Sequence, residues 1–264
     1  MRNELDDFLL HIFNKKARFE EKKFSPELKL ALNENTQFKD KYKGQRCFII
    51  GNGPSINRQD LTLLKDEITF VVNRFPHHKA AFEINPSFYV SVDPKFASGE
   101  WGTDFIEQLD QKLPNVHCFL SLDGKKFVQK NGLLKHHPIS VIQPNQYYCF
   151  GYDTPIDLTK GNPGKSNVTK TSLAIALYMG ITEINLIGID GNGLLKSDQS
   201  HFYGHEPQPS DQLELENDLI SMSLGLRGWR AILEMCEKRG ILLRSINPET
   251  ALTALPQGNF PGLN

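Results

Sequence analysis

The chain has 264 residues, of which 39% are hydrophobic and 23% are charged, and its formal net charge is -1. This length and composition predict a soluble globular protein that is long enough to bury a full core. The balanced charge argues against an extended nucleic-acid-binding face, so we expect no nucleic-acid partner. No apolar run approaches the roughly 20 residues of a membrane span, and the acidic start of the chain is unlike a signal peptide. We expect a cytoplasmic protein, with at most peripheral contact at the inner membrane.

The first 45 residues differ from the rest of the chain. They are polar, and Leu5, Phe8, Leu9 and Phe13 recur at helical spacing. We therefore expect an N-terminal helical extension over residues 1–45 and one α/β domain over residues 46–264. Such an extension suits docking on a partner, contact with a membrane-linked acceptor, or the arm of a homo-oligomer.

Short apolar runs alternate with helical patterns in the remaining chain. Strands are predicted at residues 47–50, 68–72, 88–92, 116–122, 140–142, 184–187 and 241–243. Helices are predicted at residues 61–66, 101–113, 169–179 and 212–239. This order is typical of a Rossmann-like, mainly parallel sheet with helices on both faces.

Small and polar residues follow four of these predicted strands. They are Gly51, Asn52, Gly53 and Ser55 after the first strand, Asn73 after the second, Asp93 after the third, and Asp190 after the run that ends at Ile189. Parallel sheets bind ligands at the carboxyl ends of their strands. The glycines let backbone approach a ligand, and the N–H groups after Pro54 suit an anion. A nucleotide pocket at this edge is the prediction.

Two histidines, His201 and His205, lie in the polar segment after Asp190. A zinc site is disfavoured because residues 202–204 form a poor helix and the glutamate of an HExxH motif is missing, so we expect no metal site. A histidine at the mouth of a nucleotide pocket can instead accept a proton from a hydroxyl group. Residues 143–165 and 191–210 are rich in aromatic residues and glycine, and we expect them to be active-site loops. The four cysteines lack metal-ligand spacing and are expected to be buried free thiols.

Three segments resemble the bacterial CMP-sialic acid-dependent sialyltransferases that decorate lipooligosaccharide, a metal-independent variant of the GT-A fold. They are IIGNGPS at residues 49–55, LAIALYMGITEINLIGID at residues 173–190 and SHFYGH at residues 200–205. The resemblance implies that Asn52 contacts the donor and that His205, rather than His201, is the general base. Asn73 also falls where the family has an asparagine.

The chain departs from that family at three places. The family's two phosphate-binding tyrosines are missing after Asp190, where Asn192 stands and the next tyrosine is Tyr203. Lys165 takes the place of an arginine, and Asp93 takes the place of an asparagine on the third strand. Tyr203, Lys165 and the helix start near Thr169 are therefore the candidates for stabilising the leaving phosphate.

A second resemblance covers GQRCFIIGNGPS, EITFVVNRF and FYVSVDP, at residues 44–55, 67–75 and 88–94. These segments are similar to 6-hydroxymethylpterin diphosphokinase-like proteins and to flagellin-modifying motility accessory proteins. In that group, Asp93 and Asp190 would hold Mg²⁺ between ATP phosphates.

Three hypotheses follow from the sequence. The first is an inverting glycosyltransferase of bacterial lipopolysaccharide biosynthesis, which moves a sialic acid-like sugar (nonulosonic or Kdo-type) from a CMP-activated donor to a glycan or lipid-linked glycan and needs no cofactor. The second is a Mg²⁺-dependent pterin diphosphokinase. The third is a non-catalytic nucleotide- or sugar-binding protein that keeps the fold.

Overall fold

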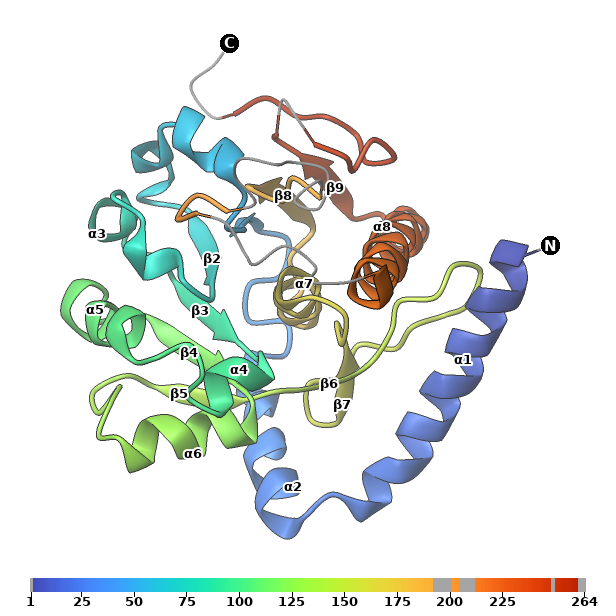
Figure 1. Ribbon diagram of the computed structural model, residues 1–264, viewed down its shortest axis with the longest axis horizontal. Coiled ribbons are helices and arrows are strands. Elements are labelled where there is room, and N and C mark those ends of the chain that lie inside the picture. Colours follow the sequence, from blue (N-terminus) through green and yellow to red (C-terminus); the bar gives the residue numbers. More distant parts are fainter. Residues whose placement is uncertain (1, 192–200, 205–211, 248–249, 261–264) are drawn as a thin grey trace.

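The computed structural model describes residues 2–191, 201–204, 212–247 and 250–260 (Figure 1). Seven parallel strands form one sheet in the order β5-β4-β3-β2-β1-β8-β9. They are β1 (Arg46–Ile50), β2 (Ile68–Val72), β3 (Phe88–Ser91), β4 (His117–Leu120), β5 (Ile139–Val141), β8 (Glu183–Ile187) and β9 (Leu242–Ser245). β1 pairs with β2 on one side and β8 on the other, so β1 is an interior strand of the sheet.

Helices cover both faces of this sheet, which confirms the predicted fold class. The α-helices are α1 (Arg2–Glu20), α2 (Pro26–Asn33), α3 (Ala81–Ile84), α4 (Pro94–Ala97), α5 (Asp104–Lys112), α6 (Leu122–Lys130), α7 (Val168–Tyr178) and α8 (Gln212–Lys238). Short 3₁₀ helices are η1 (Glu21–Lys23), η2 (Glu34–Phe38), η3 (Pro54–Arg58), η4 (Leu61–Leu64) and η5 (Phe75–His77).

Successive residues of β1 belong to two different hydrophobic clusters, because side chains alternate across a strand. Cys47 and Ile49 pack with residues of α7 and α8. Phe48 and Ile50 pack with residues of α3, α4, α5 and α6 on the other face. Burial on both faces explains why these strands are continuous apolar runs. All four cysteines of the chain are buried free thiols, as expected.

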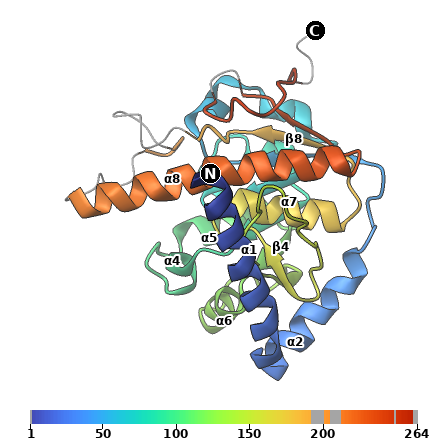
Figure 2. The ribbon, with the colours of Figure 1, turned by 90° about the vertical axis from the view of Figure 1, so that its right-hand side faces the viewer.

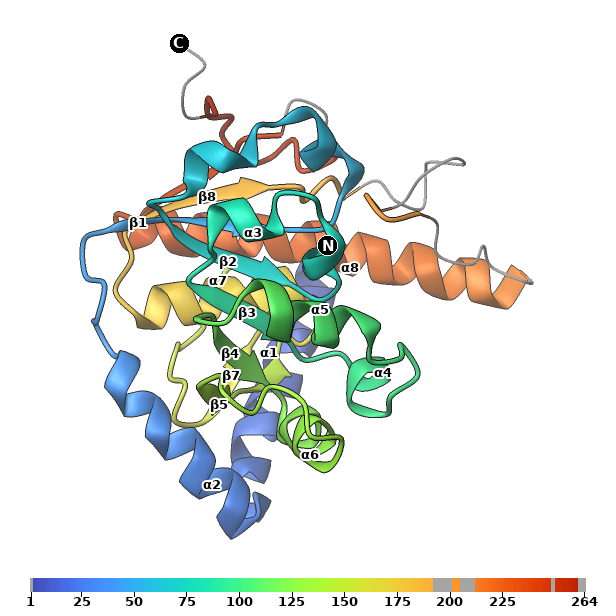
Figure 3. The ribbon, with the colours of Figure 1, turned by 90° about the vertical axis from the view of Figure 1, so that its left-hand side faces the viewer.

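α7 and α8 lie on the same face of the sheet, with α7 against β1, β2 and β3 and α8 against β9. α7 is buried along nearly its whole length, from Thr169 to Tyr178. α8 is buried only in its second half, which includes Trp229, Ile232 and Cys236. Its first half projects beyond the body of the molecule (Figures 2 and 3), and Leu213 and Ile220 are 65% and 58% exposed there.

The N-terminal residues form α1, η1, α2 and η2, and α1 runs along the side of the molecule (Figure 2). Asn14 in α1 donates to the Tyr147 carbonyl and accepts from the Tyr147 N–H, both at 2.8 Å. Arg227 of α8 pairs with Asp6 and Asp7. α1 is thus bound to the chain near residue 147 and to α8.

Residues 143–165 contain a separate two-stranded parallel ribbon, β6 (Gln143–Gln146) and β7 (Gly161–Pro163). Asn35, which is fully buried, donates to the carbonyls of Val141 and Leu158 and so ties this segment to the N-terminal helices. None of the helices in the described ranges is long and apolar enough to cross a bilayer.

Candidate functional site

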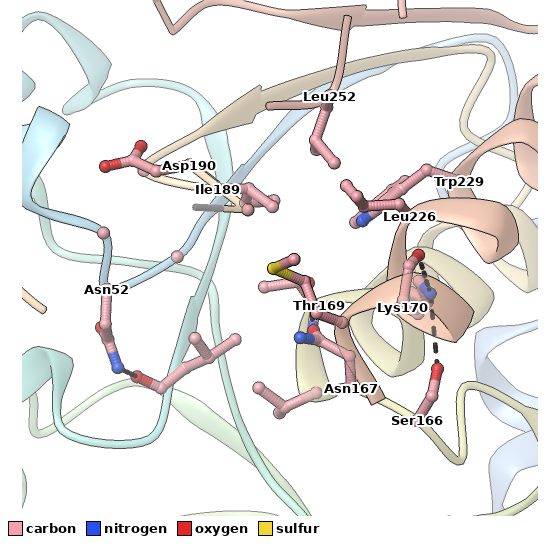
Figure 4. A pocket seen from close by; sticks show the side chains of 18 of the residues that line it. Asn52, Ser166, Asn167, Thr169, Lys170, Ile189, Asp190, Leu226, Trp229 and Leu252 are labelled. Atoms are coloured by element: carbon pink, nitrogen blue, oxygen red, sulfur yellow. Dashed lines mark hydrogen bonds between the residues drawn. The ribbon is translucent and has the colours of Figure 1, made fainter. Parts of the chain in front are cut away.

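A pocket of about 490 Å³ lies at the carboxyl edge of the sheet (Figure 4). Its volume falls in the range of roughly 300–1,000 Å³ that is usual for small-molecule sites. The loops after β1, β2 and β8 form one side, and α7 and α8 form the other. In Figure 4, Asn52 and Asp190 lie opposite Leu226, Trp229 and Lys170, with Leu252 on a third side.

The loops after β1 and β8 touch each other at glycines. The Gly53 N–H donates to the Gly188 carbonyl at 2.8 Å. A Cβ on Gly51 would lie 2.4 Å from that carbonyl oxygen, and a Cβ on Gly53 would lie 2.6 Å from Cγ of Asp190. From the sequence, these glycines are predicted to let the backbone approach a ligand. In the structure, their missing side chains make room for the neighbouring loop.

Asp190 joins three segments beneath the pocket. One carboxylate oxygen accepts the Ser55 N–H at 3.1 Å, and the other accepts the Ser55 hydroxyl and the Asn247 amide. The residue is 4% exposed. Because protein donors engage both oxygens, the carboxylate orients the η3 loop.

Two asparagines form the wall near β2. Asn52 is buried, and its amide nitrogen donates to the Val72 carbonyl at 3.2 Å. Its Oδ1 has no hydrogen-bond partner among the residues that the structure describes. Asn73 has a φ of 48°, in the left-handed region that asparagine tolerates better than most residues. Its Oδ1 accepts the Ser91 hydroxyl at 3.3 Å.

The first turn of α7 lines the pocket. Asn167 is the N-cap, and its Oδ1 accepts the Thr169 N–H at 2.8 Å and also the Thr169 hydroxyl. The positive end of the helix dipole is thereby directed at the cavity.

Lys170, in that same turn, is a buried cation in the pocket wall. It is 1% exposed, and its Nζ donates to the Gly225 carbonyl at 2.7 Å and to the Ser166 hydroxyl at 3.4 Å. Burial lowers the pKa of this amine to about 7.

The turn at residues 201–204 lies against the β1 loop. The Phe202 N–H donates to the Asn52 carbonyl at 2.9 Å, and the His201 N–H donates to the Gly204 carbonyl at 3.0 Å. His201 lines the pocket, and its ring stacks on Tyr203 with centroids 4.9 Å apart. This segment, distant in sequence from β1, therefore reaches the same cavity.

A model of the family described as 6-hydroxymethylpterin diphosphokinase MptE-like matches residues 23–192. The chain belongs to this family. The matched range includes the whole sheet except β9, together with the β1, β2 and β8 loops of the pocket.

Among solved structures, this MptE-like chain is similar to sialyltransferases. One is the sialyltransferase CstII from Campylobacter jejuni with cytidine-5'-monophosphate, at 17% identity and a TM-score of 0.48, covering 84% of this chain and 87% of that one. Another is CST-II with a trisaccharide acceptor and CMP, at 16% identity and a TM-score of 0.46, covering 83% and 88%. A search of curated proteins finds no match.

Six of the site residues predicted from the sequence line the pocket of this MptE-like chain. They are Gly51, Asn52, Gly53, Asn73, Thr169 and Asp190. Ser55 lies behind the pocket and bonds to Asp190. His205 falls outside the described residues, as does most of the expected loop at residues 191–210.

Three of the predicted residues are placed away from the pocket lining. Asp93 is the N-cap of α4, where it accepts the Lys95 N–H at 2.8 Å. Lys165 is exposed, and its Nζ lies 4.4 Å from the centre of the Phe13 ring. Tyr203 stacks on His201 and faces the Arg74 guanidinium. Residues 143–165, which were expected to form an active-site loop, pack on α1. Among the described residues that line the pocket, none belongs to this segment, whereas Ser166, the next residue along the chain, does line it.

The sequence does not predict a site role for Lys170, for Asn167 or for the pocket-lining residues of α8. Lys170 sits in the run TKTSLAIALYMG, where one lysine in a helix normally indicates a solvent-exposed side. The available signals were the Asn-Val-Thr start, which is typical of a helix N-cap, and the pair of glycines at 225 and 228 within a long helical pattern.

Proposed function

We propose that this chain is an inverting glycosyltransferase that moves a sialic acid-like sugar, of the nonulosonic or Kdo type, from a CMP-activated donor to a glycan acceptor. The observation that carries the proposal is the pocket itself, which combines Asn52, Asn73, the α7 N-terminus and a buried lysine at the carboxyl edge of the sheet. These groups suit a ligand that has both an anionic part and hydrogen-bonding edges.

The chemistry requires one proton transfer and one displacement. In the proposal, the His205 imidazole takes the proton of the acceptor hydroxyl, and the acceptor oxygen bonds to the anomeric carbon of the sugar. The bond from that carbon to the phosphate oxygen breaks, and CMP leaves with the electron pair. General-base assistance of this kind typically contributes roughly 10²- to 10⁴-fold. Support for His205 comes from the turn at residues 201–204, which is bonded to Asn52 and directly precedes His205.

The second candidate is a Mg²⁺-dependent pterin diphosphokinase, which the family description favours. The residues that it needs do not fit a magnesium site in the described structure. Both oxygens of Asp190 accept protein hydrogen bonds, and Asp93 caps α4 outside the pocket lining. We therefore rank the CMP-sugar transferase first, because a CMP phosphodiester is a good leaving group without a metal.

Calorimetry with CMP, ATP, UDP and GDP, each with Mg²⁺ and with EDTA, separates the two candidates. CMP binding that survives EDTA supports the transferase. ATP binding that requires Mg²⁺, together with loss of activity in Asp93→Asn and Asp190→Asn, would replace it with the diphosphokinase. Binding of CMP without donor consumption above background would make the chain a binding protein.

The base is tested by comparing His205→Ala with His201→Ala on a CMP-sialic acid donor. We expect His205→Ala to lower kcat by roughly 10²- to 10⁴-fold with little change in CMP affinity. His201→Ala should act mainly on binding, since His201 lines the pocket. Near-normal turnover by His205→Ala would contradict the assignment of the base.

A further inference from the structure

Lys170 is a charged side chain that is almost fully buried in the wall of a cavity. Its two acceptors, the Gly225 carbonyl and the Ser166 hydroxyl, both belong to pocket-lining residues, and Ser166 is exposed (Figure 4). The ammonium therefore lies one hydrogen bond behind the pocket surface. An ammonium has three protons to donate, and the described residues supply these two acceptors.

No counter-charge accompanies this cation within the described residues. No carboxylate there forms an ion pair with Lys170, and its Nζ lies over the Trp229 ring, 5.6 Å from the ring centroid. A buried charge without an opposite charge is costly to a folded protein. Side chains whose pKa is strongly perturbed by burial in a cleft cluster at functional sites.

α8 is shaped to accommodate the lysine. A Cβ on Gly228 would lie 2.4 Å from Nζ of Lys170, so a side chain at this helix position would push the amine out of its present place beside Gly225. A glycine in a helix interior costs roughly 0.5–1 kcal/mol relative to alanine. The second half of α8 thus carries a helix-weakening residue at the point where the amine needs space.

Few titratable groups face Lys170 from the elements around it. The Tyr148 hydroxyl donates to the Lys170 backbone carbonyl at 3.3 Å, Asp218 of α8 lines the same pocket, and Asp190 lies on the opposite side of the pocket. Burial accounts for the lowered pKa of the amine, with no charged neighbour contributing. In the free protein above neutral pH, the amine is therefore largely unprotonated.

We propose that Lys170 supplies the positive charge for an oxyanion of the bound ligand, a phosphate or a carboxylate, and that the amine takes up a proton when this anion binds. The proposal deepens the proposed function, since it concerns the same pocket. An anion next to the amine favours its charged form, so binding and protonation are coupled. Anion affinity is expected to be highest below neutral pH and to fall as the pH rises above it.

The test is calorimetric titration at pH 8 in two buffers of different ionisation enthalpy. With CMP we expect uptake of about one proton per site, because the free amine is mostly neutral at this pH and the bound amine is charged. Uncharged cytidine should bind without uptake. Free N-acetylneuraminic acid distinguishes the two sources of the oxyanion, since uptake with the sugar acid assigns the subsite to a carboxylate and uptake with CMP assigns it to a phosphate.

Lys170→Met removes the charge and keeps an unbranched side chain, and Lys130→Met is the matched control at an exposed position of α6. We expect Lys170→Met to abolish the proton uptake and to weaken binding of the anion by roughly 10- to 100-fold below pH 7, where the wild-type amine is charged. Lys130→Met should match the wild type. Far-UV circular dichroism and a thermal melt establish that each variant is folded.

Several outcomes overturn this inference without touching the proposed function. One is binding of both CMP and N-acetylneuraminic acid with no proton uptake in the wild-type protein, and another is uptake that persists in Lys170→Met. A third is loss of the uptake in Lys165→Met instead. If Mg²⁺–ATP binds and CMP does not, the transferase proposal fails, and the same buffer comparison with ATP decides the role of Lys170. Binding of none of these anions overturns the inference as well.

Discussion

Gly53 lets the β1 loop pass against Asp190 at the carboxyl edge of the sheet. Its φ of -64° suits any residue, so the requirement for glycine is steric. We expect Gly53→Ala to lower the free energy of unfolding by about 1–3 kcal/mol, because the new Cβ would lie 2.6 Å from Cγ of Asp190. Urea unfolding monitored by tryptophan fluorescence measures the change.

A double-mutant cycle isolates the cause of that loss. Asp190→Ala removes the Cγ that the new methyl would strike, so Gly53→Ala should cost less in this background than in the wild type. Equal costs in both backgrounds would mean that contact with the Gly188 carbonyl, 2.8 Å away, dominates.

Gly225 and Gly228 provide a matched pair on α8. A Cβ on Gly225 meets no atom of the described residues within 4 Å, whereas a Cβ on Gly228 would displace the Lys170 amine. We therefore predict that Gly225→Ala raises the free energy of unfolding by roughly 0.5–1 kcal/mol through helix propensity. Gly228→Ala should lower it by about 1–3 kcal/mol, because the hydrogen bond from Lys170 to the Gly225 carbonyl must break. Thermal melts of the two variants, compared side by side, test the opposite signs.

The strand ends can be predicted from the sequence, but the roles of the residues at those ends cannot. Asn52, Asn73 and Asp190 were predicted at one edge, and parallel strands necessarily bring them together. The engagement of Asp190 by Ser55 and Asn247 could not be predicted, because it depends on how three loops distant in sequence fold over one another. Lys170 was missed for the same reason, since its burial is decided by α8.

Elements were predictable where hydrophobic periodicity is strong. The expected helices at residues 169–179 and 212–239 correspond to α7 and α8, and the apolar runs correspond to the strands of the large sheet. α6 was missed because its apolar first residue, Leu122, continues the run of β4. β6 and β7 contain proline and glycine, residues that are poor strand formers, so nothing in their sequence indicated a ribbon.

Asn14 anchors α1 to the chain at Tyr147. Its side-chain amide forms two hydrogen bonds with the Tyr147 backbone and is buried. We expect Asn14→Ala to lower the free energy of unfolding by about 2 kcal/mol and to loosen α1 selectively, because two partly buried backbone groups would lose their partner. Limited proteolysis should cut the α1 segment faster in this variant. Lys16→Ala, two residues later on an exposed position, is the control, and equal cleavage of both variants would contradict the anchoring role.

Two histidines of the described structure, His78 and His117, are kept neutral near neutral pH because burial disfavours their charged form. Burial lowers the pKa of both His78 and His117 to about 4. His117 is surrounded by Phe38, Phe88 and Phe119, and its Nε2 lies 2.9 Å from the Ser140 hydroxyl. Both rings are therefore harder to protonate in the folded chain than in the unfolded chain, where the pKa is about 6.5.

This difference in histidine pKa between the folded and unfolded chains determines how the free energy of unfolding depends on pH. Between about pH 6.5 and pH 4 the unfolded chain binds protons that the folded chain does not, so the free energy of unfolding falls as the pH falls through this window. We expect a loss of roughly 1–2 kcal/mol per histidine, measured as urea midpoints at half-unit pH intervals. In His78→Asn/His117→Gln the slope should become shallower, because neither replacement titrates. His136→Gln, at an exposed position, should keep the wild-type slope. A double variant as steep as the wild type would assign the acid sensitivity to groups other than these two histidines.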